Sequence, residues 1–204
     1  DGGGMLATLN RGAAWFPVDG GSLNTYAFTL LCDPTNGHLY NGTGFGDQFW
    51  KSADGGATWT RARYLFTHDS EHGMAVDPVT AGRLYLSAYG AGVYRSDDGG
   101  GTWVNPDSLS TTLGNLFVRS LVAVPGQSGH VYVGAGNGVW ESLDGASTWN
   151  QKSNGLPGVF SVRSLAVVAG SPPALFVGSD SAGVWKSTNG GTSWAAATRS
   201  HSTS

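Results

Sequence analysis

Short apolar runs alternate with polar turns along the whole chain. Between residues 107 and 152 the runs are Val118–Val124, His130–Gly134, Gly138–Ser142 and Thr148–Gln151. They are rich in Val, Leu, Tyr and Trp, and Gly, Pro, Asn and Asp bound them. This pattern is typical of strands joined by hairpins, and no stretch keeps a helical period over three turns. The sequence therefore predicts an all-β protein.

The same order of four runs recurs in three other segments. The first run of each set is almost wholly apolar, which predicts a strand that is covered on both faces. The third run has one charged position whose sign differs between copies (Arg95, Glu141 and Lys186), so we expect this side chain to face solvent. The other runs are Tyr26–Asp33, His38–Gly42, Gln48–Ser52, Thr58–Arg61, Gly73–Asp77, Arg83–Ser87, Gly92–Ser96, Thr102–Asn105, Val162–Val168, Ala174–Gly178, Gly183–Ser187 and Ser193–Ala197.

An eight-residue phrase that ends in tryptophan spans the turn between the third and fourth runs. The tryptophans of its five copies are 44, 44, 46 and 45 residues apart. A fixed period of this size predicts a repeat architecture, in which each unit packs against its neighbours. The copies are Thr8–Trp15, Ser52–Trp59, Ser96–Trp103, Ser142–Trp149 and Ser187–Trp194.

The phrase predicts a turn that is closed by its own side chains. Its third residue is an Asp or Asn, which can accept hydrogen bonds from backbone N–H groups just ahead of it. The terminal tryptophan is expected to bury its ring between neighbouring units. Because Asn replaces Asp in two copies, the pattern favours a structural role over proton transfer. The residues are Asn10 with Trp15, Asp54 with Trp59, Asp98 with Trp103, Asp144 with Trp149 and Asn189 with Trp194.

The phrase Ser-x-Asp-x-Gly-x-Thr-Trp resembles the Asp-box, also called the bacterial neuraminidase repeat. Four good copies and one degenerate copy cover essentially the whole chain. The resemblance implies a β-propeller of four-stranded blades, as in sialidases, xyloglucan-cleaving glycoside hydrolases, sortilin-type receptors and the photosystem II assembly factor. Because these functions are so diverse, the resemblance carries a fold and no particular activity.

The repeats predict one propeller domain over residues 1–204, with about four and a half blades. We expect a half-blade at 1–18 (strands Gly3–Thr8 and Ala14–Val18), blades at 19–62, 63–106, 107–152 and 153–198, and a tail at 199–204. A ring with an open edge exposes unpaired backbone groups. The chain is then a piece of a longer propeller, a five-bladed ring with one thin blade, or a unit whose copies pair strands. The start at Asp1 favours the first or the third.

Composition narrows the function classes. Charged residues make up 12% and the net charge is −3, which argues against nucleic acid. The sequence contains nothing that resembles a transmembrane span or a signal peptide, although a signal could have been removed before Asp1. Cys32 has no second cysteine to pair with and is expected to be a small buried apolar residue. High Gly, Ser and Thr with few lysines favour a secreted or periplasmic protein.

The least repetitive stretch, Thr67–Gly73, leads into the first strand of a blade, and loops there rim the central channel of a propeller. His68 and His72 suggest a metal, but on an extended strand they are roughly 13 Å apart, so we expect neither metal nor cofactor. Asp69 and Glu71 point the same way on an extended segment. Paired carboxylates hydrolyse glycosidic bonds, although a solvated acidic loop also explains the pair.

A second candidate set is basic. His72, Arg119 and Arg163 each lie two residues before equivalent apolar positions of a first strand. Ring symmetry would gather them around the channel to hold a carboxylate, sulfate or phosphate; alternatively, each arginine bonds carbonyls of the adjacent blade. Sialidases use three arginines with a Tyr–Glu pair and an Asp. This chain departs from them, since it is too short for six blades and shows no assignable Tyr–Glu pair.

These observations favour a non-catalytic binding or scaffold propeller that recognises a glycan or a protein, with no nucleic-acid or membrane partner. The alternative is a fragment of a glycoside hydrolase, xyloglucanase-like or sialidase-like, with Asp69 and Glu71 as acid and base. A third hypothesis is a unit that assembles into a homo-oligomer. Aromatic residues expected near the rims could stack on sugar rings: Phe45, Phe49, Tyr64, Phe66, Tyr89 and Phe160.

Overall fold

The computed structural model describes residues 6–8, 11–17, 27–43, 48–62, 71–88, 92–105, 117–158 and 161–197. These residues form antiparallel sheets, and no helix occurs among them. Each sheet is built from strands that follow one another along the chain. The predicted fold class, an all-β propeller, is confirmed.

Four sheets correspond to blades and one to the half-blade. Blades 1, 3 and 4 each have four strands; blade 2 has three strands and, in place of a fourth, a single bridge between Arg95 and Val104. The half-blade is β1 (Leu6–Ala7) paired with β2 (Phe16–Pro17). Blade 1 is β3 (Ala27–Cys32), β4 (Leu39–Thr43), β5 (Gln48–Ser52) and β6 (Thr60–Ala62); blade 2 is β7 (Glu71–Val76), β8 (Leu84–Ala88) and β9 (Gly92–Ser96); blade 3 is β10 (Ser120–Ala123), β11 (Val131–Ala135), β12 (Gly138–Ser142) and β13 (Asn150–Gln151); blade 4 is β14 (Val162–Val168), β15 (Ala174–Ser179), β16 (Val184–Ser187) and β17 (Ala195–Ala196).

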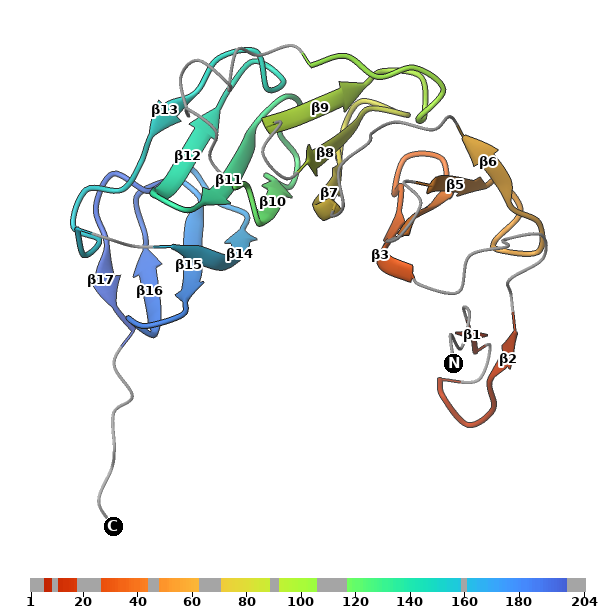
Figure 1. Ribbon diagram of the computed structural model, residues 1–204, viewed down its shortest axis with the longest axis horizontal. Helices are drawn as coiled ribbons and strands as arrows, with labels where there is room; N and C mark the ends of the chain where they lie inside the picture. The colour runs from red at the N-terminus through yellow and green to blue at the C-terminus, as the bar shows by residue number, and fades with distance from the viewer. Residues whose placement is uncertain are drawn as a thin grey trace.

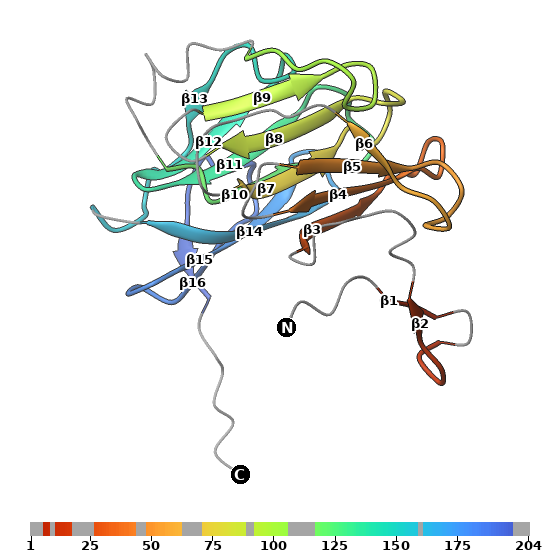
Figure 2. The same ribbon diagram turned by 45° about the vertical axis from the view of Figure 1, so that its right-hand side comes forward.

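The sheets follow one another around an open arc (Figure 1). The first strands β3, β7, β10 and β14 lie side by side along its inner edge, and Figure 2 shows the blades stacked from another side. The half-blade lies beyond blade 1, and blade 4 is at the opposite end of the arc (Figure 1). Consecutive blades therefore pack face to face, whereas the two ends of the arc lie apart.

The apolar core is divided among the contacts between blades. Tyr85 and Val93 of blade 2 pack with Val133, Trp140 and Trp149 of blade 3 in one cluster. Equivalent clusters join blade 1 to blade 2 and blade 3 to blade 4. Most of the buried apolar side chains thus pack against the neighbouring repeat, as in other repeat proteins. A smaller cluster, Trp50 and Trp59 with Leu39, lies within blade 1.

The charged position of the third run was predicted to face solvent, and this is wrong for blade 3. Glu141 is only 7% exposed, and Arg95 donates a hydrogen bond to the carbonyl of Gly145 in the next blade. The reason is that this face of each sheet packs against the blade that follows. Lys186, in blade 4, is exposed, and among the described residues no blade packs against this face.

Candidate functional site

The Asp-box turn is held by a compact set of hydrogen bonds. In blade 1 the Asp54 carboxylate accepts bonds from the backbone N–H of Thr58 (2.9 Å) and from the hydroxyls of Thr58 and Ser52. The hydroxyl of Ser52 in turn accepts the N–H of Gly56 at 2.8 Å. The turn closes on itself because one short side chain satisfies donors on both of its arms.

The same geometry repeats in the other blades. Asp98 accepts the N–H of Thr102, and Asp144 accepts that of Thr148, both at 2.8 Å. In blade 4 the carbonyl of Asn189 accepts the N–H of Ser193, while its amide nitrogen donates to the Ser193 hydroxyl. Asn therefore replaces Asp with one hydrogen bond reversed in direction.

Hydrogen bonds keep the carboxylates of these turns ionised. The hydroxyl and N–H of Thr58 hold the pKa of Asp54 at about 2, and the N–H of Thr102 lowers the pKa of Asp98. Burial alone would raise the pKa of Asp144, but the bonds from Thr148 and Ser142 outweigh it and lower the pKa. A carboxyl group whose pKa lies so far below neutral pH is a poor proton donor, because general acids work best when their pKa is near the operating pH.

The tryptophans of four turns lie in the core, as expected, and the fifth does not. Trp59, Trp149 and Trp194 are 6–7% exposed, and Trp103 packs edge-on against Phe49 with ring centroids 5.4 Å apart. Trp15 is 60% exposed. The described residues of its half-blade form only two short strands, and no described sheet covers the indole ring.

The turns of blades 2, 3 and 4 also reach the preceding blade through their first glycine. Arg95 Nη1 donates to the carbonyl of Gly145 at 2.8 Å, and the Tyr132 hydroxyl donates to that of Gly190 at 3.3 Å. At Gly99, a Cβ would lie 3.0 Å from Lys51 Nζ. The turn thus acts as a plug, and the second and third strands of the preceding blade form its socket.

Buried aspartates form a second link between blades. Asp77 is fully buried, and its carboxylate accepts the N–H of Gly129 in the next blade at 2.7 Å. Asp33 accepts the N–H of Gly82 at 3.2 Å in the same way. Burial opposes ionisation of both groups, but the hydrogen bonds outweigh it and lower each pKa. These carboxylates are structural acceptors at the blade contacts.

Blade 3 contains a buried charged cluster around Glu141. One carboxylate oxygen contacts His130 Nε2 at 3.0 Å and accepts the Tyr132 hydroxyl, and the other contacts Lys152 Nζ at 3.0 Å. Burial would raise the pKa of Glu141, but bonds from these three partners hold it at about 2. Burial and the nearby Glu141 charge raise the pKa of Tyr132. The cluster lies next to blade 4, away from the axis of the arc.

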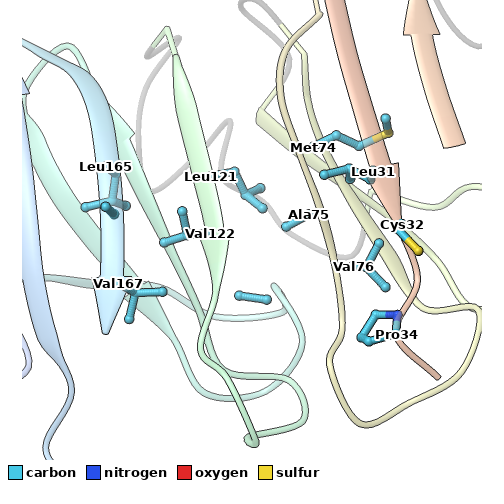
Figure 3. A pocket seen from close by; sticks show the side chains of 12 residues that line it. Leu31, Cys32, Pro34, Met74, Ala75, Val76, Leu121, Val122, Leu165 and Val167 are labelled. Atoms are coloured by element: carbon cyan, nitrogen blue, oxygen red, sulfur yellow. The ribbon is translucent and has the colours of Figure 1, made fainter. Parts of the chain in front are cut away.

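The inner edge of the arc contains a cavity of about 430 Å³ (Figure 3). Met74, Leu31 and Val76 line one side of it, and Leu121 and Leu165 come from the blades opposite (Figure 3). We call it the axial pocket. Its whole lining is Leu31, Cys32, Pro34, Met74, Ala75, Val76, Leu121, Val122, Ala123, Leu165, Ala166 and Val167.

Cys32 was expected to be buried, and this is wrong. It is an exposed free cysteine on the wall of the axial pocket (Figure 3). The reason is its place on a first strand, whose inner edge faces the axis rather than another blade.

The predicted basic set lies at irregular points of the first strands. The pairing of β7 with β8 and of β14 with β15 skips one residue, at His72 and at Arg163. Arg119 directly precedes β10, and its backbone N–H donates a hydrogen bond to the carbonyl of Gly134. Such bulges re-aim side chains and are common beside binding sites. Sequence reasoning found the shared position but could not show the bulge.

The two arginines of this set have different surroundings. Arg163 Nε bonds both oxygens of the half-exposed Asp180 carboxylate, so this arginine serves an ion pair within its own blade. The Nε atom of Arg119 is buried and has no hydrogen-bond partner among the described residues. The structure therefore does not bring Arg163 into a free basic cluster, and neither arginine is seen bonding a carbonyl of the adjacent blade through its Nε.

Several predicted residues lie outside the described part of the chain. These are Asn10, His68, Asp69 and the aromatics Phe45, Tyr64, Phe66, Tyr89 and Phe160. Glu71 and His72 belong to β7, but their side chains are not described. Phe49 was expected near a rim and is instead fully buried, stacked with Tyr40, because it faces blade 2.

Two further findings concern only the described residues. No three side chains of His, Cys, Asp or Glu among them gather to hold a metal ion. Within the same ranges no helix is long and apolar enough to cross a membrane.

Comparisons with known proteins identify the fold. The chain matches no protein-family model and no curated protein. Among solved structures it resembles a GH74 enzyme from Niastella koreensis (23% identity, TM-score 0.73) and the GH74 xyloglucanase from Xanthomonas campestris (21%, 0.74); each match covers 96% of this chain and 34% of the other. It also resembles YCF48 bound to D1 peptide (14%, 0.54), over 78% of this chain and 50% of that one. The chain thus spans about a third of the GH74 enzymes and shares their β-propeller fold.

Proposed function

We propose that this chain is a non-catalytic binding propeller, whose axial pocket takes an apolar side chain of a protein or peptide partner. The observation that carries the proposal is the lining of the pocket, where first strands of four blades contribute apolar side chains. Binding sites are typically apolar cavities with a few polar groups that fix orientation. The described residues of the lining include no aromatic ring on which a sugar would stack, which favours a peptide over a glycan.

Arg119 supplies a polar group near the pocket. It lies two residues before the pocket residue Leu121, and its buried Nε lacks a partner. Leaving a buried donor unpaired costs about 1–3 kcal/mol, so a rotation of the Arg119 side chain that brings Nε to an acceptor on a ligand would recover that free energy. A peptide carbonyl or carboxylate beside the apolar anchor fits this requirement.

The described carboxylates support binding rather than hydrolysis. Each has hydrogen-bond or ion-pair partners in a turn, a blade contact or a surface pair: Asp33, Asp54, Asp77, Asp97, Asp98, Glu141, Asp144 and Asp180. Among the solved structures above, YCF48 is seen with a bound peptide, which agrees with a propeller of this kind recognising protein. We also propose that the protein is secreted or periplasmic, as its composition favours. The proposal further takes residues 1–204 as one propeller domain.

The test uses a displayed library of random peptides and the folded chain as bait. Peptides with an apolar residue next to an acceptor should be enriched. Ala166→Trp, which fills an exposed position of the pocket wall, should reduce their capture at least about tenfold. Leu143→Asp is the matched control, since Leu143 is 63% exposed and does not line the pocket. Equal losses in both variants, or no enrichment at all, would contradict the proposal.

The second candidate is a fragment of a glycoside hydrolase, and the likeness to GH74 enzymes over 96% of the chain favours it. In this case Asp69 and Glu71 would be acid and base, and Glu71 begins a first strand at the inner edge of the arc. Incubation with xyloglucan and measurement of reducing ends tests it. Turnover that is lost in Asp69→Asn and Glu71→Gln would replace the binding proposal with this one.

A further inference from the structure

The outer face of blade 4 repeats the sockets of the other blades but is uncovered. Val184 occupies the position of Phe49, Val93 and Val139 in the strand pairing. Those three residues are fully buried, whereas Val184 is 51% exposed. Val168 is 54% exposed, while Val124 at the equivalent position is fully buried. The apolar positions that are exposed in blade 4 are therefore the positions that pack against the following blade in the other blades.

The polar part of this socket is also preserved. Lys51 Nζ lies 5.9 Å from the ring centre of Tyr40, next to the plug of blade 2. In blade 4, Lys186 Nζ lies 5.4 Å from the ring centre of Phe176 in the same register. A lysine thus lies over an aromatic ring at the end of the arc, and none of the described turns packs against it. We call Val168, Phe176, Val184 and Lys186 the end socket.

The opposite end of the arc has a plug without a socket. The first glycine of the Asp-box turn is buried in three blades, at Gly99, Gly145 and Gly190. Gly55, in blade 1, is exposed, and a Cβ there would meet no atom within 4 Å. The half-blade lies at this end of the arc (Figure 1), yet Gly55 is exposed.

We propose that the end socket binds the Asp-box turn of blade 1 from a second copy of this chain. The contact continues an interface that the molecule already forms three times between its own blades. Lys186 would donate to the carbonyl of Gly55, as Arg95 does to that of Gly145. The charges agree as well, because the lysine meets a turn that carries the ionised Asp54.

The contact is head to tail, since it joins different ends of the two copies. A pair of copies keeps one free plug and one free socket, so association continues until a ring closes or a string forms. It uses surfaces other than the axial pocket and is independent of the binding function proposed above. It also covers the apolar positions that are exposed at the end of blade 4.

The first experiment measures mass by sedimentation over a wide range of concentrations. The unmodified chain should exceed 21.1 kDa with increasing concentration, in multiples of that mass. Val184→Asp introduces a charge in the end socket, and Gly55→Asn adds a side chain to the plug at a positive φ that Asn tolerates. Each variant alone should remain at 21.1 kDa. Gly126→Asn is the control, because Gly126 has a similar φ and open surroundings in a turn away from both ends.

Mixing the two variants separates this mode of assembly from others. Val184→Asp keeps a working plug and Gly55→Asn a working socket, so an equimolar mixture should form a dimer of twice 21.1 kDa and nothing larger. A chain that stays monomeric at every concentration would overturn the proposal. So would association that survives in either variant alone, or a mixture that fails to pair while both variants keep the circular dichroism of the unmodified chain.

Discussion

Replacing Glu141 with glutamine should remove a pH-dependent part of the stability of the fold. The carboxylate is 7% exposed and is held by His130, Tyr132 and Lys152 next to blade 4. These bonds outweigh the opposing effect of burial and lower its pKa from 4.5 to about 2. That difference corresponds to about 3 kcal/mol of stability at neutral pH.

The stabilisation by Glu141 should weaken as the pH falls, because folding lowers the pKa of its carboxyl group. A group whose pKa is depressed on folding stabilises the fold above its unfolded pKa, here 4.5, and the stabilisation is lost as the pH falls through the folded value of about 2. By pH 3 about 2 kcal/mol of it should have gone. Glutamine keeps the shape of the side chain but does not titrate.

The assay is urea unfolding of both proteins at pH 7, 5, 4 and 3, followed by tryptophan fluorescence. Other carboxylates titrate in both proteins, so the difference in unfolding free energy between them isolates Glu141. This difference should shrink by about 2 kcal/mol from pH 7 to pH 3. A difference that stays constant with pH would show that Glu141 acts through packing and that its charge contributes nothing. Asp180→Asn, in a half-exposed pair with Arg163, should change stability by no more than about 1 kcal/mol at any pH.

Three further predictions concern the turns and blade contacts, and each is measured by urea unfolding at pH 7. Gly100→Ala should cost about 3 kcal/mol or more, because its Cβ would lie 2.2 Å from Phe49 at a positive φ; Gly55→Ala, at a positive φ but in open space, should cost only about 1–2 kcal/mol, and equal losses would contradict the packing argument. Asp144→Asn should cost less than about 1 kcal/mol, since Asn189 already closes the same turn, whereas Asp144→Ala should cost about 2–3 kcal/mol; the reverse order would reject the proposed hydrogen-bond reversal. Asp77→Ala should cost about 3 kcal/mol or more because it leaves the buried N–H of Gly129 unpaired, and a loss below 1 kcal/mol would mean that this link between blades is dispensable.

The repeat made the fold predictable. Short apolar runs separated by polar turns predicted strands joined by hairpins. The predicted runs Gln48–Ser52 and Gly138–Ser142 coincide with β5 and β12. The regular spacing of the tryptophans indicated blades, since each indole ring needs a neighbouring sheet to cover it. Local pattern was sufficient here because each blade is a local unit whose strands pair in chain order.

Which face of a strand meets a neighbour was not predictable in the same way. The charge alternation at Arg95 and Glu141 looks like a solvated face, yet both side chains lie at contacts between blades. Cys32 and Phe49 were misplaced for the same reason. Periodicity shows that alternate residues share a face, but the relative positions of two blades decide which face is covered. The axial pocket likewise arises only when four blades stand side by side.

The joints between blades also differ chemically from one to the next. Asp33 and Asp77 link the first two joints, but Val124 stands at that position in the third, where Glu141 carries the buried charge instead. Each blade is consequently matched to one neighbour and would leave an unpaired carboxylate or N–H beside another. Because a wrong pair of blades would bury such an unpaired group, the native order of blades is favoured over exchanges between repeats that share the same turn and strand pattern.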